Sequence, residues 1–150
     1  MLKLIACLIL CLILMAVTNV EAGMSESKLI CETIAREGFM RAGKPYMDDY
    51  IAIARTIRNR LLLKWDGETT IHGIILHPMA FSAWNPGVEM AERTKEQLEA
   101  ASLAWELSAI PADFPATHYH LADMKEYPSW AGKIKYLCQV GKHKFYQEVR

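Results

Sequence analysis

Two histidines one residue apart, His118 and His120, lie in an aromatic-rich stretch and are the first residues whose types and spacing suggest chemistry. A His-x-His pair in an extended segment, with His143 as a distant third ligand, is a usable zinc spacing. Alternate residues share a face only on a strand, however, and no third ligand stands at a diagnostic spacing. A cleft wall and hydrogen-bonded packing are the other interpretations, and packing is the plain interpretation of His72 and His77.

Aromatic residues outside the expected main helices favour a cleft. These residues are Phe81, Trp84, Tyr119, Tyr127, Trp130, Phe145 and Tyr146. Their flat apolar faces and polar tips suit sugar rings, which expose C–H faces and peripheral hydroxyls. Part of the set is expected to fill the core of a small lobe instead. The pattern predicts a carbohydrate cleft rather than a metal centre.

Glu37 is the candidate for acid catalysis on such a substrate. Cleavage of a glycosidic bond needs a carboxyl that protonates the leaving oxygen. Glu37 ends an apolar helical face just before Gly38, where a carboxyl is half buried and still reaches a cleft. Glu32 points elsewhere on the helix and is expected to be solvated. The alternative for Glu37 is a charge that only ends a helix.

Helices must position most of these residues, because amphipathic segments dominate the chain before Pro111. The first helix is expected from Ser25 to Arg41, with Glu37 on its inward face. A second helix begins near Met47, and a short third one is capped by Thr70. Each of these helices has capping or first-turn residues that suit its start.

The last long helix opens at Thr94 with Gln97 three residues later, which is a capping box. Its expected inward residues are Leu98, Ala101, Leu103, Trp105 and Leu107. Prolines then break helices, and Lys133 to Val140 and Lys144 to Val149 are expected as strands or a small hairpin around Gly141. The predicted fold class is mainly α (α+β), a helical domain with a small irregular or β-containing lobe.

The N-terminal region predicts export. Lys3 is followed by an apolar run from Leu4 to Val17 and then by Val20-Glu21-Ala22, a small-x-small pattern that suits signal peptidase. Residues 1–22 are expected to be a signal peptide or an uncleaved signal anchor, and the run is shorter than the about 20 apolar residues of a membrane span. The expected location is the periplasm or cell wall, with transient membrane contact through this segment.

Residues 23–150 are expected to form one domain. In an oxidising compartment Cys31 and Cys138 would be able to pair and close a long loop, and two separate buried thiols are the alternative. The chain has 17 basic and 17 acidic side chains, so no net charge steers it to a polyanion. Nucleic acid is therefore not an expected partner.

Several blocks, in order, resemble the SleB-type cell wall hydrolases, the family of spore cortex-lytic enzyme catalytic domains. The blocks are LICETIAREG, IAIARTIRNR, MAFSAWN, ATHYHLAD, YPSWA and VGKHKFYQ, and together they extend over about Leu29 to Gln147. The resemblance implies a fold similar to that of lysozyme-like lytic transglycosylases. It also implies a monomeric enzyme without cofactor that cuts peptidoglycan glycan strands between N-acetylmuramic acid and N-acetylglucosamine.

The family's catalytic glutamate aligns with Glu37. The resemblance implies that this single carboxyl first acts as the acid and then as the base on the muramyl 6-hydroxyl, which leaves a 1,6-anhydro product. If Asp48 or Asp49 reached the cleft, either would be able to activate water and turn the reaction into hydrolysis.

The other blocks imply the substrate-binding residues. These are Ser82, Trp84, Asn85, His118, Tyr119, His120, Trp130 and Tyr146, and the blocks also include Ser129, His143 and Phe145. Tyr119, His120 and Trp130 are expected to line the glycan groove, and Ser82 or His118 to orient Glu37 or its substrate. His118 and His120 are therefore interpreted as cleft lining, without a metal.

The sequence departs from the family pattern directly after Glu37. Family members usually continue as E-A-R-G-E-P-Y, whereas this chain has GFMRAGKPY, which is longer and has Lys44 in place of the second acid. Lys44 is expected to act on a nearby carboxyl or to contact carboxylates of the substrate. The departure concerns the expected substrate preference more than the expected catalysis.

Two biological settings fit these features, cell wall remodelling and phage lysis by an endolysin. Two other functional classes are weighed beside them. A zinc-dependent peptidoglycan peptidase or amidase would use His118, His120 and His143, and a non-catalytic protein would bind glycan without cutting it.

Overall fold

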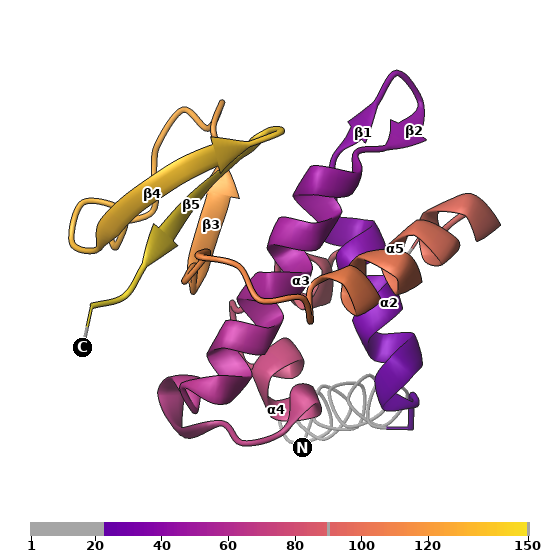
Figure 1. Ribbon diagram of the computed structural model, residues 1–150, viewed down its shortest axis with the longest axis horizontal. Helices are drawn as coiled ribbons and strands as arrows, with labels where there is room; N and C mark the ends of the chain where they lie inside the picture. Colours follow the sequence, from indigo (N-terminus) through magenta and orange to yellow (C-terminus); the bar gives the residue numbers. More distant parts are fainter. Residues whose placement is uncertain (1–22, 90, 150) are drawn as a thin grey trace, which may run out of the picture.

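The computed structural model describes residues 23–89 and 91–149, so the expected signal or anchor at residues 1–22 lies outside the described residues. Helices form one part of the molecule and a small antiparallel sheet lies beside helix α3 (Figure 1). The elements in order are α2 (Glu26–Glu37), β1 (Met40–Arg41), β2 (Lys44–Pro45), α3 (Met47–Leu62), the 3-10 turn η1 (Trp65–Gly67), α4 (Ile71–Leu76), the 3-10 turn η2 (Ser82–Trp84), α5 (Lys95–Leu107), β3 (His118–Leu121), β4 (Lys135–Val140) and β5 (His143–Gln147). The predicted combination of a helical domain with a small β lobe is confirmed.

Helix α2 ends at Glu37, before the predicted end at Arg41. Gly38 lies so close to the ring of Tyr50 that an added Cβ would collide with it. The next amide, Phe39 N–H, donates to Asp49 Oδ2 at 2.8 Å and so leaves the helical ladder. A tertiary contact with α3 therefore fixes the residue at which α2 stops, and it places Glu37 in the last turn.

The other helices begin where their caps predict. Thr70 accepts from Gly73 N at 3.0 Å, and Thr94 forms the full capping box with Gln97. The helices meet through a buried aliphatic core, whose fully buried members include Leu29, Ile34, Ile53, Ile57, Ile74 and Ile75. Burial of each such side chain stabilises the fold by about 1.5–3 kcal/mol. Leu103 does not join this core as predicted, because it is 48% exposed on the outer side of α5.

The sheet has the order β3-β5-β4 and is antiparallel, so β3 is an edge strand. The predicted strands on either side of Gly141 are confirmed as β4 and β5. In the register of β3 with β5, Tyr119 pairs with Phe145 and Leu121 pairs with His143. Residues that pair directly share a face of the sheet, and alternate residues of a strand do too. One face of the sheet therefore presents Tyr119, Leu121, His143 and Phe145, and the other presents His118, His120, Lys144 and Tyr146.

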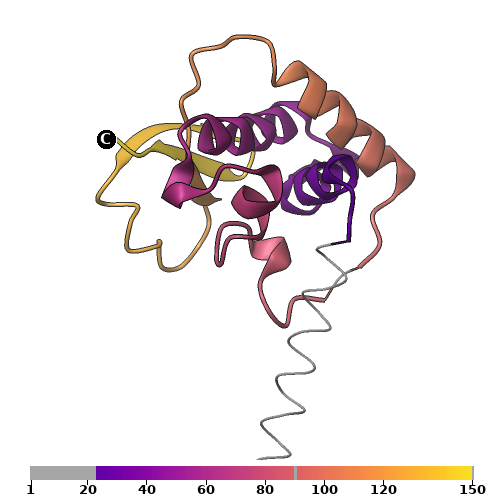
Figure 2. The same ribbon diagram turned by 90° about the horizontal axis from the view of Figure 1, so that it is seen from below.

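Cys31 and Cys138 are both free thiols, which corresponds to the alternative of two separate thiols and not to the possible disulfide. Cys31 belongs to α2 and Cys138 to β4, and α3 lies between these two elements (Figure 2). Among the described residues, no helix has the length and apolar character needed to cross a bilayer.

Candidate functional site

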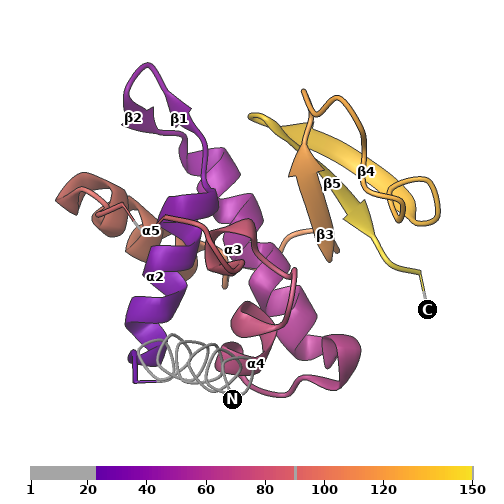
Figure 3. The same ribbon diagram turned by 180° about the vertical axis from the view of Figure 1, so that it is seen from behind.

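A cleft of about 670 Å³ lies where the end of α2, the turn η2 and the edge strand β3 come together. Figure 3 shows these elements from the side on which η2 and the segment before it face the viewer. The residues that line the cleft are Arg36, Glu37, Met79, Ala80, Ser82, Asn85, Tyr119, His120, Leu121, Met124, Pro128, Trp130 and His143. Residues of α2 and of the chain around η2 form one wall, the helical wall, and residues of the sheet and its connections form the other, the sheet wall.

Glu37 is the carboxylate that both walls hold. Its Oε1 accepts from the Ser82 hydroxyl at 2.8 Å and from the Ala83 backbone N–H at 2.7 Å. Its Oε2 accepts from the Tyr119 hydroxyl at 2.9 Å. A carboxylate offers roughly four acceptor positions, so these three bonds leave about one position, on Oε2, open to a further partner. Glu37 is thus fixed in orientation while it can still exchange a proton.

Tyr119 is a donor to Glu37 and not a competing base. Burial raises the pKa of Tyr119 well above its ordinary value, and the charge of Glu37 raises this pKa further. The phenol therefore keeps its proton, which it donates to Glu37 Oε2. Its ring packs against Phe145 at 5.5 Å and against His143 at 5.2 Å between ring centroids. The packing holds the hydroxyl in place.

Arg60 lies buried behind the site and links α3 to both walls. Its Nε donates to Thr117 O at 2.6 Å and its Nη1 donates to Ala80 O at 3.1 Å. The guanidinium also stacks on the ring of Phe81, 4.8 Å from the centroid. Burial lowers the pKa of Arg60 to about 10, which still leaves the group charged at neutral pH.

Trp84 fixes the turn that delivers Ser82 and Ala83, although it was predicted to bind substrate. Its indole N–H donates to Thr33 Oγ1 at 2.9 Å, and its ring packs on the hydrophobic core. The backbone N–H of Asn85 bonds back to Ser82 O at 3.2 Å and closes η2. Trp84 therefore lies behind the cleft wall and positions the donors to Glu37.

The two histidines of the His-Tyr-His stretch lie on the face of β3 opposite to Tyr119. The ring of His118 packs against those of Trp65 and Trp130, at 5.7 and 5.0 Å between centroids. Burial and the nearby Arg60 charge lower the pKa of His118 to about 4, so this ring is neutral at pH 7. His118 is not among the residues that line the cleft, and Ser82 alone makes the hydrogen bond to Glu37 that was expected from one of the two.

His120 lines the cleft with its ring while both of its nitrogens are bonded within the protein. Nδ1 donates to Leu121 O at 2.8 Å, so Nε2 accepts from the Tyr146 hydroxyl at 2.9 Å. Tyr146, predicted to bind substrate, is buried and supports His120 from behind. Within the described part of the chain, no three His, Cys, Asp or Glu side chains gather as metal ligands would.

The cleft thus brings together Glu37 and five of the predicted substrate-binding residues, which are Ser82, Asn85, Tyr119, His120 and Trp130. Trp84, His118 and Tyr146 lie outside its lining. Sequence reasoning missed Arg36, Met79 and Met124 as lining residues, and it considered His143 as a metal ligand and as part of the closing family block without giving it a role in the cleft. The structure shows the role of His143 through the register of β3 with β5, in which Tyr119 and His143 are diagonal neighbours on one face.

The structure also places the charged residues that the sequence analysis considered beside Glu37. Asp49 is completely buried and Asp48 lies on the surface of α3, so neither acid reaches the cleft. Lys44 is exposed in the β1–β2 hairpin, which contributes no residue to the cleft lining. Glu32, expected to be solvated, is only 13% exposed and pairs with Arg36 at 2.9 Å.

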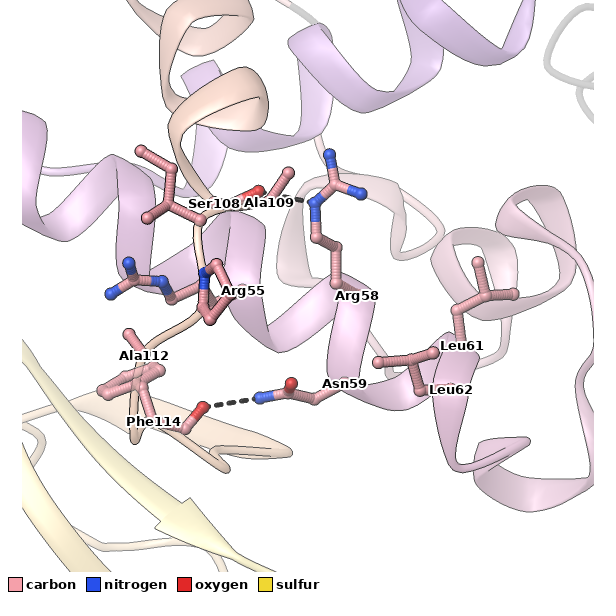
Figure 4. A pocket seen from close by; sticks show the side chains of 11 residues that line it. Arg55, Arg58, Asn59, Leu61, Leu62, Ser108, Ala109, Ala112 and Phe114 are labelled. Carbon is pink, nitrogen blue, oxygen red and sulfur yellow. Dashed lines mark hydrogen bonds between the residues drawn. The ribbon is translucent and has the colours of Figure 1, made fainter.

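A second hollow of about 340 Å³ lies between the second half of α3 and the chain after α5. Figure 4 shows that the guanidinium groups of Arg55 and Arg58 point in different directions there. Arg58 is occupied, since it donates to Ser108 Oγ at 2.7 Å and to Trp105 O at 2.9 Å. Asn59 donates to Phe114 O at 2.8 Å. The polar groups of this second hollow do not converge on one point, so the cleft at Glu37 is the better candidate site.

Comparison with protein families gives one match, a model described as cell wall hydrolase that covers residues 45–146. The chain belongs to the cell wall hydrolase family. The matched region starts after Glu37, so the match includes the β3 residues of the cleft but not the carboxylate itself. No curated protein matches the chain.

Solved structures agree with this cell wall hydrolase assignment. The chain is similar to the catalytic domain of the germination-specific lytic transglycosylase SleB from Bacillus anthracis, with 25% identity, a TM-score of 0.59 and coverage of 83% of this chain and 98% of that chain. It is also similar in fold to the catalytic domain of the Bacillus cereus SleB protein, with 22% identity, a TM-score of 0.59 and coverage of 83% and 93%. The resemblance to SleB-type hydrolases inferred from the sequence blocks is confirmed.

Proposed function

We propose that this cell wall hydrolase cleaves the glycan strands of peptidoglycan, with Glu37 as its catalytic acid and base. One observation carries the proposal: the Glu37 carboxylate receives donors from both walls of a cleft that is lined by aromatic and polar side chains. The named activity of the SleB neighbour, a lytic transglycosylase, supports the same chemistry. The bond cleaved is the one between N-acetylmuramic acid and N-acetylglucosamine.

The geometry supports a mechanism with one carboxyl. Protonated Glu37 gives its proton to the glycosidic oxygen as the bond from this oxygen to C1 breaks. The resulting carboxylate takes the proton of the muramyl 6-hydroxyl, whose oxygen bonds to C1 and forms the 1,6-anhydro product. The second carboxylate that hydrolysis usually needs is not found in the cleft, because Glu37 is the one acidic residue in its described lining.

The donors around Glu37 assist the second half of this cycle. Ser82, Ala83 N–H and Tyr119 stabilise the carboxylate that forms after the first proton transfer. Trp130 and the ring of His120 supply apolar surface for sugar rings on the sheet side of the cleft. The protein would act outside the membrane as an exported monomer, in wall remodelling or as a phage endolysin.

Mass spectrometry of the soluble products tests the proposal directly. Purified protein is incubated with peptidoglycan, with and without a chelator, beside the Glu37→Gln variant. The expected products are anhydro-muropeptides, formed equally in chelator and reduced about 10²- to 10⁴-fold in the variant, the range for loss of a general acid-base group. Reducing-end sugars would indicate hydrolysis, and cut peptides or chelator-sensitive activity would refute the proposal.

A further inference from the structure

His143 is a cleft residue that the proposed mechanism does not use. It begins strand β5 and shares the sheet face of Tyr119, whose hydroxyl bonds to Glu37. Its side chain is 6% exposed, and it lines the cleft. The ring therefore shares the cleft with the carboxylate that is proposed to react, and Tyr119 contacts both.

Asp49 holds the ring of His143 in one orientation. His143 Nδ1 lies 2.8 Å from Asp49 Oδ1, and Asp49 is 0% exposed. The second carboxylate oxygen of Asp49 accepts from Phe39 N–H at 2.8 Å. Because a carboxylate only accepts, it fixes the Nδ1–H tautomer of the neutral imidazole, so that Nε2 carries the lone pair.

The Nε2 atom of His143 is open to the cleft. It has no hydrogen-bond partner among the described residues. The buried side-chain atoms that lack a partner belong to Glu32, Arg36 and Arg55, so Nε2 of His143 is not sealed inside the protein. Since His143 lines the cleft, the solvent that reaches Nε2 is that of the cleft.

The side chains of Ser82, Tyr119 and His120 in the cleft already make hydrogen bonds within the protein. The hydroxyls of Ser82 and Tyr119 donate to Glu37, and both nitrogens of His120 are bonded within the protein. Sugar hydroxyls need acceptors as well as donors. His143 Nε2 is an oriented acceptor that the protein itself does not occupy.

We propose that His143 binds a hydroxyl of the glycan through Nε2, with Asp49 as the positioning residue that fixes its tautomer. The inference rests on the proposed function, because it assumes a sugar in the cleft. Tyr119 places the contact close to the reaction, since its ring touches His143 and its hydroxyl touches Glu37. His143 would thus select and orient the sugar next to the bond that breaks.

Binding by inactive protein tests this inference without relying on cleavage. The probe is glycan strand from which the peptides have been removed, titrated into full-length Glu37→Gln protein. The double variant Glu37→Gln with His143→Asn keeps a donor to Asp49 but lacks a group at the position of Nε2. One net hydrogen bond is worth about 0.5–1.5 kcal/mol, so the dissociation constant should rise about 3- to 10-fold. The matched control is His72→Asn. His72 does not line the cleft, and its Nε2 lies 3.0 Å from Met24 O.

Asp49→Asn gives a second, independent test. The asparagine oxygen still accepts from Phe39 N–H while its amide donates to His143 Nδ1, which moves the imidazole proton to Nε2. The acceptor becomes a donor, so binding should weaken about 3- to 10-fold although the melting temperature stays near that of the parent. A purely structural role of the pair predicts unchanged binding in any Asp49→Asn protein that folds.

The outcomes separate the two proposals. Unchanged binding in folded His143→Asn or Asp49→Asn protein would overturn the role of Nε2, while cleavage by the unmodified protein would still support the proposed function. Weaker binding in both variants, with no cleavage by the unmodified protein, would support the contact and refute the reaction. If the Glu37→Gln protein binds no glycan strand, the contact proposed for His143 is overturned, and cleavage by the unmodified protein still decides the proposed function.

Discussion

The two walls of the cleft are built in different ways. The helical wall, with Glu37 and Ser82, rests on aliphatic packing, since Ile34 on α2 is completely buried. The sheet wall also buries Phe145, but polar bonds tie it to α3, namely Asn59 to Ala116 O at 2.9 Å, Arg60 to Thr117 O at 2.6 Å and Asp49 to His143 at 2.8 Å. Aliphatic packing tolerates small changes, whereas a buried polar bond fails when one partner is removed. The sheet wall should therefore be the more sensitive of the two to single substitutions.

The largest effect is expected where a buried hydrogen-bonded pair, Asp49 and His143, ties the sheet wall to α3. Asp49→Ala leaves two buried donors, His143 Nδ1–H and Phe39 N–H, without their acceptor, and each such loss costs about 1–3 kcal/mol in the free energy of unfolding. Urea denaturation measures this loss. Asp48→Ala, at the exposed neighbour in the same helical turn, is the control and should cost less than about 1 kcal/mol. Equal urea midpoints for the two variants would contradict the inference that polar bonds to α3 hold the sheet wall in place.

A smaller effect is expected when the walls stay together but their shared hydrogen bond is lost. Tyr119→Phe keeps the ring packing and removes the donor to Glu37 Oε2. Hydrogen bonds to charged groups are worth about 1.5–3 kcal/mol, so kcat should fall about 10- to 100-fold with little change in KM. Tyr127→Phe, at a phenol that is 47% exposed, is the matched control. Native kcat in Tyr119→Phe would show that the sheet wall does not act on Glu37.

On the helical wall the loss of a donor should matter less. Ser82→Ala removes one bond to Glu37 Oε1, but the Ala83 N–H still donates to the same oxygen at 2.7 Å. We expect a loss of activity of about 3- to 10-fold, the size of one net hydrogen bond. Ser27→Ala, at an exposed serine of α2, controls for the change in residue type. A loss greater than that of Tyr119→Phe would reverse the ranking of the walls.

The smallest effect concerns His118, on the face of β3 opposite to Tyr119, and is a dependence of the protein's stability on pH. Burial lowers the pKa of His118 from 6.5 to about 4 in the folded protein. Between these values the unfolded chain binds the proton more tightly, so this group reduces stability as the pH falls from 6.5 to 4. His118→Gln should make the stability of the protein less dependent on pH in that window, as measured by thermal unfolding. A steeper dependence in the variant would contradict the direction of the shift.

Local signals were sufficient for the helices and for part of the cleft. Thr70 and Thr94 mark helix starts because caps depend on neighbouring residues, and the position of Glu37 on the inward face of α2 follows from helical periodicity. The order of the sequence blocks indicated Ser82 and Tyr119. These features depend on residues close together in the chain or on the family resemblance.

Features that depend on distant contacts were not predictable in the same way. The end of α2 depends on Tyr50 and Asp49 of another helix. The Asp49 carboxylate is in turn held away from the cleft by its bond to His143 of the last described strand. Trp84 and His118 are aromatic residues that suit a sugar cleft by type, yet tertiary packing turns both toward the protein. Residue type predicted the chemistry of the cleft, and only the fold decides which rings face it.

The hydrogen bond from Tyr119 to Glu37 joins residues 82 positions apart in the chain. Contacts of such sequence separation form late in folding, because the entropy of closing a long loop opposes them. The helices can therefore regain their circular dichroism before the carboxylate has its full set of donors. After dilution from denaturant, recovery of enzymatic turnover should lag behind recovery of helix content, and the length of the lag reports how fast the sheet docks onto α3.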